Sequence, residues 1–187
     1  MQTQNLEGGF IDPAIDAAHV FRAVMQAMAR PGTIHRVSGA VPPKPLSRAA
    51  GATVLTLCDS ETPVYLAGAM DCPDLRDWIA FHTGAALTGP GHCMFALGHW
   101  QDLLPLSAYP IGTPDYPDRS ATLIVETARL GMEGPVLRGP GIRQTAALSL
   151  PETRAFQLNH ALFPQGLDFL FACDDRLAAL PRSTEVA

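Results

Sequence analysis

Apolar positions along the chain recur at the three- and four-residue spacing that is typical of helices. Near the start of three such segments stands an Asp, a Ser or a Pro, which suits the capping or first positions of a helix. Pro and Gly interrupt helices and therefore indicate where two of the segments end. We expect helices from Asp12-Pro13 to Arg30-Pro31-Gly32, from Ser47 through Leu57, from Pro73-Asp74 to Gly84, and over residues 151–162.

The first predicted helix has one apolar face that we expect to pack on the core. Another of its faces carries His19, Arg22 and Gln26 and should be exposed to solvent. The residues of the expected buried face are Ala14, Ala17, Phe21, Val24 or Met25, and Met28.

Short apolar runs bounded by turn residues alternate with these helices, as the central strands of a covered sheet do. The pattern predicts an α/β fold. Residues 1–11 are expected to be a loose arm. Residues 105–120, rich in Pro, Gly and Asp, are expected to be an irregular segment that is functional, a partner surface or partly disordered. The expected strands are residues 64–66, 94–97, 122–125, 136–137 and 167–172.

Length and charge exclude several classes of protein. With 187 residues the chain fits a single domain over 1–187. Its net charge of −5 argues against a nucleic-acid binder, which needs a basic face. No apolar run is long enough to span a bilayer and no secretory leader is evident, so a cytoplasmic protein is expected. Charged residues make up only 17% of the chain, which indicates that partners cover part of its surface.

Arginine dominates the basic residues, since Lys44 is the one lysine among 13. Several arginines lie in turns rich in Pro and Gly. A guanidinium offers a rigid fork of donors that matches phosphate, so these turns predict an anion site; a compositional bias toward arginine is the alternative. A further alternative for Arg182 is that it bonds backbone carbonyls and fixes the C-terminal segment. The candidate anion-binding residues are Arg22, Arg30, Arg119, Arg138, Arg182 and Thr184.

Metal and covalent cofactor chemistry are not expected. His92 and Cys93 would point to opposite faces of a strand and cannot easily share an ion. Lys44 lies between prolines, a poor setting for a Schiff base with pyridoxal phosphate. The four cysteines are scattered and are read as free thiols, mostly buried. No nucleophile stands out. The loop carboxylates are potential acids or bases if paired, or they bind their own turns: Asp59, Glu61, Asp115, Asp118 and Asp168.

The order of short signatures along nearly the whole chain resembles the PhnH family, the phosphonate metabolism proteins of the carbon-phosphorus lyase system. Near the C-terminus the family usually has Leu-Pro-Arg-Thr-Thr, whereas this chain has Ser183 at the first Thr position and so keeps the hydroxyl. The signatures are Gly9-Phe10, Phe21-Arg22, residues 25–32, residues 57–63, residues 137–142, Asn159, residues 163–168 and residues 180–184.

The resemblance implies a three-layer α/β/α sandwich with a mixed sheet, similar to pyridoxal-phosphate-dependent transferases but without the cofactor. It also implies a homodimer when isolated and a complex with PhnG, PhnI and PhnJ. The implied reaction of that complex is transfer of the ribose triphosphate moiety of ATP to methylphosphonate, to which this chain contributes without catalysing it alone. Two alternatives stay open: a homodimer that binds ATP or a phosphonate, and a plain homodimeric scaffold.

Overall fold

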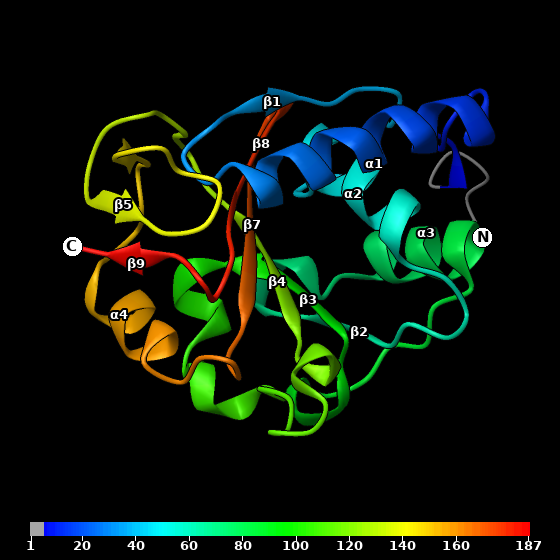
Figure 1. Ribbon diagram of the computed structural model, residues 1–187. Coiled ribbons are helices and arrows are strands. Elements are labelled where there is room, and N and C mark those ends of the chain that lie inside the picture. Colours follow the sequence, from blue (N-terminus) through cyan, green and yellow to red (C-terminus); the bar gives the residue numbers. More distant parts are fainter. Residues whose placement is uncertain (1–5) are drawn as a thin grey trace.

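The computed structural model describes residues 6–187, which form a mixed six-stranded sheet covered on both faces (Figure 1). Strands β2, β3, β4 and β7 are parallel, and β8 and β1 add antiparallel pairs at one side. The α/β prediction with a mixed sheet is therefore confirmed. In spatial order the strands are β1 (His35–Arg36), β8 (Arg176–Leu180), β7 (Asp168–Cys173), β4 (Thr122–Glu126), β3 (Phe95–His99) and β2 (Val64–Leu66).

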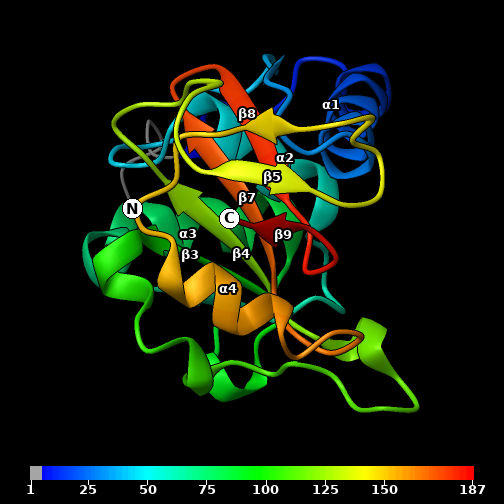
Figure 2. The ribbon, with the colours of Figure 1, turned by 60° about the vertical axis from the view of Figure 1, so that its left-hand side comes forward.

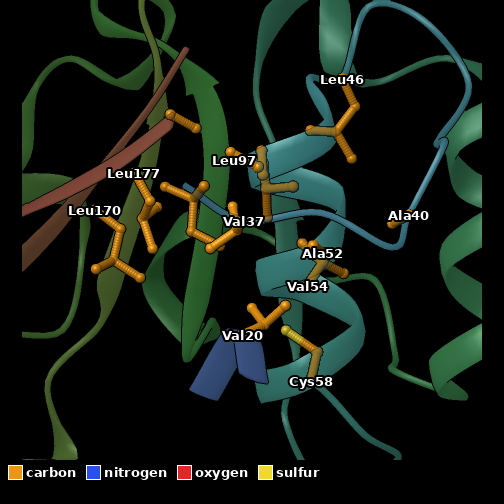
Figure 3. Packing of buried hydrophobic residues seen from close by; sticks show 14 of the residues in the cluster. Val20, Val37, Ala40, Leu46, Ala52, Val54, Cys58, Leu97, Leu170 and Leu177 are labelled. Carbon is orange, nitrogen blue, oxygen red and sulfur yellow. The ribbon is translucent and has the colours of Figure 1, made fainter. Parts of the chain in front are cut away.

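Alternating side chains of the central strands enter two separate cores. On β4, Ile124 faces the first core, whereas its neighbours Leu123 and Val125 face the second. The first core lies under three helices, and Figure 3 shows Val54 and Leu97 among the side chains packed between α2 and the strands. These helices are α1 (Pro13–Ala29), α2 (Arg48–Leu57) and α3 (Pro73–Thr83).

The second core lies under α4 (Arg154–His160) and a small antiparallel sheet. The rings of Trp100, Phe156 and Phe169 contact one another there, with centroids 4.8 to 6.2 Å apart. The small sheet has the spatial order β6 (Ala146–Ala147), β5 (Val136–Arg138) and β9 (Glu185–Val186).

All four predicted helices are present, and their caps explain their bounds. The Asp12 carboxylate accepts from the Ile15 N–H, Ser47 accepts from the Ala50 N–H, and Gly84 ends α3 in the left-handed conformation with φ 69°. The fourth helix is shorter than expected, running only over Arg154–His160.

Two expectations about packing are wrong, and one strand was not predicted. Residues 136–137 do not lie in the central sheet, because β5 pairs with β6 and β9 instead. Strand β8 was not predicted, although all of its residues pair with residues 169–173 of β7. On α1 the buried residues are Val20, Ala23, Val24 and Ala27, whereas Ala14 and Phe21 of the expected core face are exposed. Of the two alternatives Val24 and Met25, Val24 is the buried one.

The predicted loose arm is attached where it can be described. Residues 1–5 lie outside the described residues. Beyond them, Trp78 Nε1 donates to the Glu7 carbonyl at 3.0 Å and the Val41 N–H donates to the Gly8 carbonyl at 2.8 Å. These bonds hold the segment against α3 and the loop that leads to α2.

The cysteines are free thiols, as predicted, and three of the four are buried. Burial raises the pKa of Cys58 to about 12 and that of Cys93 to about 11, so neither is a reactive thiolate at neutral pH. No helix within residues 6–187 combines the length and the apolar composition needed to cross a membrane.

Candidate functional site

Three turns that are far apart in the sequence meet on one side of the molecule, and we call them the turn cluster: residues 30–32, 139–141 and 181–184. A Cβ on Gly141 would lie 1.8 Å from the carbonyl oxygen of Ala29, and one on Gly139 would lie 2.9 Å from that of Ser183. Both glycines have positive φ, so glycine suits these positions. Figure 2 shows the loops around β5 beside the end of α1 and the segment before β9.

An ion pair between Asp168 and Arg182 anchors the turn cluster to the central sheet. The Asp168 carboxylate accepts from Nε and Nη2 of Arg182 and from its backbone N–H at 2.8 Å. The same guanidinium donates to the Pro117 carbonyl at 2.6 Å and to the Ser120 hydroxyl. The Arg182 and Asp168 side chains are only 13% and 17% exposed. These contacts are those expected of a structural role for Arg182, because its donors are directed at the protein itself.

A polar clamp at the end of α4 holds the neighbouring loop. Asn159 Nδ2 donates to the Leu167 carbonyl at 2.9 Å, and the Leu167 N–H donates to Asn159 Oδ1 at 2.8 Å. His160 Nδ1 donates to the Arg182 carbonyl at 2.9 Å. The sequence analysis named Asn159 as part of a family signature but assigned no role to this residue, and it did not identify His160.

The candidate arginines differ in their surroundings. Arg30 lies in the turn cluster and Arg138 directly precedes one of its turns; both are exposed, and neither forms an ion pair with any residue in the described part of the chain. His35 lies near enough to sense Arg30: burial, followed by the Arg30 charge, lowers the pKa of this histidine. Two guanidinium groups are therefore free to meet an external anion.

The remaining candidates are only partly brought together. Arg22 is exposed on α1 about 12 Å along the helix from Arg30. Arg119 lies over the ring of Tyr116, with 4.1 Å between the guanidinium carbon and the ring centroid. Thr184 is 2% exposed, and its hydroxyl is the one buried side-chain polar atom without a partner among residues 6–187.

Two clefts flank the clamp. The larger, about 680 Å³, runs between α4 and residues 104–111 and contains no charged side chain among its lining residues. The smaller, about 380 Å³, opens beside the Asp168–Arg182 pair. It is lined by Met28, Pro117, Asp118, Phe163, Pro164, Asp168, Pro181, Arg182 and Ser183. The predicted irregular segment 105–120 thus contributes to both clefts.

Residues 6–187 contain no group of three or more His, Cys, Asp or Glu side chains that is arranged to hold a metal ion. Asp59 accepts from the Glu61 N–H within its own turn at 2.9 Å. Sequence reasoning missed the buried Glu126, whose carboxylate accepts from the Ser47 N–H at 2.7 Å at the start of α2; burial raises its pKa.

Comparison with known proteins shows the family of this chain. The model of the family described as bacterial phosphonate metabolism protein (PhnH) matches residues 8–187. The chain is also similar to a Rhizobium meliloti (strain 1021) protein named alpha-D-ribose 1-methylphosphonate 5-triphosphate synthase subunit PhnH. The two are 40% identical over 196 residues, covering 99% of this chain and 97% of that protein. The chain therefore belongs to the PhnH family of bacterial phosphonate metabolism proteins.

Proposed function

We propose that this chain is the PhnH subunit of an alpha-D-ribose 1-methylphosphonate 5-triphosphate synthase in the carbon-phosphorus lyase pathway. The observation that carries the proposal is the match to a curated subunit of that name over 99% of this chain and 97% of the relative. The convergence of the family signatures in the turn cluster supports it. In the proposed reaction, a phosphonate oxygen bonds to C1′ of the ATP ribose while adenine leaves.

The proposed contribution of this chain is to shape or stabilise the complex with PhnG, PhnI and PhnJ. Asp168 and Arg182 bond to each other, and Arg182 also donates to the Pro117 carbonyl, which supports a structural role for this pair. The proposal also includes a cytoplasmic location, a homodimer when isolated, and a three-layer fold similar to pyridoxal-phosphate-dependent transferases without their cofactor. The covered mixed sheet supports this fold.

Co-expression with and without this chain tests the proposal. PhnG, PhnI and PhnJ should give an assembly that converts ATP and methylphosphonate into the ribose phosphonate product only when this chain is present. An active, stable assembly that lacks the chain would refute the proposal. Turnover by the purified chain alone would refute its non-catalytic role.

A second candidate function is direct binding of ATP or a phosphonate at the turn cluster. The exposed, unpaired Arg30 and Arg138 favour it, since a bidentate arginine contributes about 1.5 to 3 kcal/mol toward a phosphate group when partly desolvated. Titration calorimetry should then show binding that Arg30→Ala and Arg138→Ala each weaken about tenfold or more. Arg129→Ala, at an exposed arginine paired with Glu133, is the matched control. Absence of heat with the unmodified chain would exclude this function.

A further inference from the structure

Helix α1 is apolar on two opposite faces. Its inner face, described above, packs on the first core. The opposite side carries Ala14, Ile15, Ala18, Phe21 and Met25, all of them exposed. Exposed apolar side chains that are contiguous on a surface helix are typical of a face that another molecule covers. The isolated chain thus leaves uncovered a face whose composition suits burial.

The exposed apolar side chains of α1 form one stripe around Arg22, and we call these five residues together the outer face of α1: Ile15, Ala18, Phe21, Arg22 and Met25. Their spacing of three and four residues places them side by side along the helix. Ile15 is 56% exposed, Phe21 50% and Met25 52%. Figures 1 and 2 show α1 at the periphery of the molecule, where contiguous apolar surface marks an interaction site.

One charge interrupts this stripe, and it constrains what covers the face. Arg22 lies among Phe21, Ala18 and Met25 and forms no ion pair in the described part of the chain. Burying a guanidinium is unfavourable unless it is paired, so the covering surface must present a carboxylate to it. An apolar surface around an acidic group therefore fits the outer face.

A second copy of this chain does not offer that complement through the same face. When two identical faces pack about a two-fold axis, a charge near the middle of one meets the same charge on the other. The carboxylates of α1 are directed elsewhere: Asp12 accepts from the Ile15 N–H at 3.3 Å, and Asp16 accepts from the Asp12 N–H at 3.1 Å. Charge complementarity thus favours a different polypeptide.

We propose that the outer face of α1 binds another subunit of the synthase, through an apolar surface with a carboxylate opposite Arg22. This inference rests on the proposed function. The arginine and the exposed phenylalanine beside it match the residue types that dominate the centres of protein interfaces.

Co-purification tests the inference. The full-length chain is co-expressed with tagged PhnG, PhnI and PhnJ, and the amount retained on the tagged partners is measured. Phe21→Glu, Met25→Glu and Arg22→Glu should each lower retention at least tenfold, whereas Arg22→Lys keeps part of it. The control is Phe81→Glu, at a phenylalanine that is 63% exposed on α3, and it should be retained like the unmodified chain.

The outcomes separate the two proposals. Failure to retain the unmodified chain overturns the proposed function and the inference together. Retention of the unmodified chain and of all three Glu variants overturns the inference alone. If the variants turn an isolated dimer into a monomer but stay bound to the partners, a second copy covers this face and the inference is wrong. Arg22→Glu keeps the test decisive even if Phe21→Glu or Met25→Glu fails to fold, because it changes only an exposed, unpaired side chain. Its melting temperature should match that of the unmodified chain.

Discussion

Asp168 and Arg182 join the open end of the β7–β8 hairpin to the turn cluster. Asp168 is the first residue of β7, and Arg182 follows the last residue of β8 by two positions. Asp168 Oδ1 accepts from the Arg182 N–H at 2.8 Å and from its Nε at 3.2 Å. The bond from Arg182 to the Pro117 carbonyl extends this link to the irregular segment before β4. One guanidinium therefore fastens three separate parts of the chain.

Replacing Arg182 with alanine should destabilise the protein. The substitution leaves the Asp168 carboxylate, 17% exposed, without its cation and frees the Pro117 carbonyl. Breaking a buried pair of this kind costs about 3 kcal/mol in free energy of unfolding. A chain of this length should then lose about 6 to 12 °C in melting temperature, which a thermal unfolding curve measures.

An exposed ion pair provides the control for that measurement. Arg129 and Glu133 pair on the surface with side chains 76% and 55% exposed, so Arg129→Ala should cost less than about 0.5 kcal/mol. Equal melting temperatures for Arg182→Ala and the unmodified chain, together with weaker ATP binding by calorimetry, would instead assign Arg182 to the anion site.

The helices and most parallel strands were predictable because their signals are local. Asp12, Ser47 and Gly84 cap their helices within three residues of sequence, and the apolar run of β4 lies between turns. The buried face of α1 was not predictable, because apolar residues occur on both sides of the helix and periodicity alone does not say which side meets the core.

Pairing between segments that are distant in the sequence explains the other differences between the predicted and the observed structure. The small sheet brings β5 beside β9, which lies near the C-terminus, and strands β6 and β9 are only two residues long, too short to leave a pattern. Sequence reasoning singled out the three turns of the cluster, but their meeting depends on tertiary contacts such as that of Gly141 with Ala29. The Asp168–Arg182 pair likewise depends on β8, which was not predicted.

Adding a methyl group at Gly141 should disrupt the turn cluster. The φ of Gly141 is 81°, and an added Cβ would lie 1.8 Å from the Ala29 carbonyl oxygen. Left-handed backbone alone costs an alanine about 1 to 2 kcal/mol, and the turn must also move away from α1, so Gly141→Ala should lose at least about 2 kcal/mol in a denaturant titration. Gly89→Ala is the control, because nothing lies within 4 Å of its added Cβ. Similar losses for both variants would contradict close packing of the turn.

Removing the side chain of Asn159 should loosen the loop after α4. Asn159 is 7% exposed and satisfies both the N–H and the carbonyl of Leu167. Asn159→Ala leaves those two buried backbone groups without partners, at about 1 to 3 kcal/mol each. The expected result is faster amide hydrogen exchange at Leu167 and a lower melting temperature. Leu158→Ala, at a side chain 53% exposed, should change both far less. Unchanged exchange at Leu167 in Asn159→Ala would show that water replaces the clamp.

Glu126 makes stability depend on pH in a direction that follows from its burial. Desolvation raises its pKa above the ordinary 4.5, so the folded protein binds this proton more tightly than the unfolded chain does. The ionised carboxylate of Glu126 therefore lowers the free energy of unfolding. This effect has its full size at pH values above the pKa of Glu126 in the folded protein, and it vanishes below the pKa of Glu126 in the unfolded chain.

Glu126→Gln should consequently raise the melting temperature at pH 8, because the amide oxygen still accepts from the Ser47 N–H and carries no charge. The gain should shrink as the pH falls through the folded pKa of Glu126 toward 4.5. Melting curves of both proteins at pH 8, 6 and 5 measure it, with Glu61→Gln at an exposed carboxylate as the control. A gain that stays constant, or that grows toward acid pH, would mean that the charge of Glu126 is compensated in the fold; His99, which acts electrostatically to lower the pKa of Glu126, is the candidate partner.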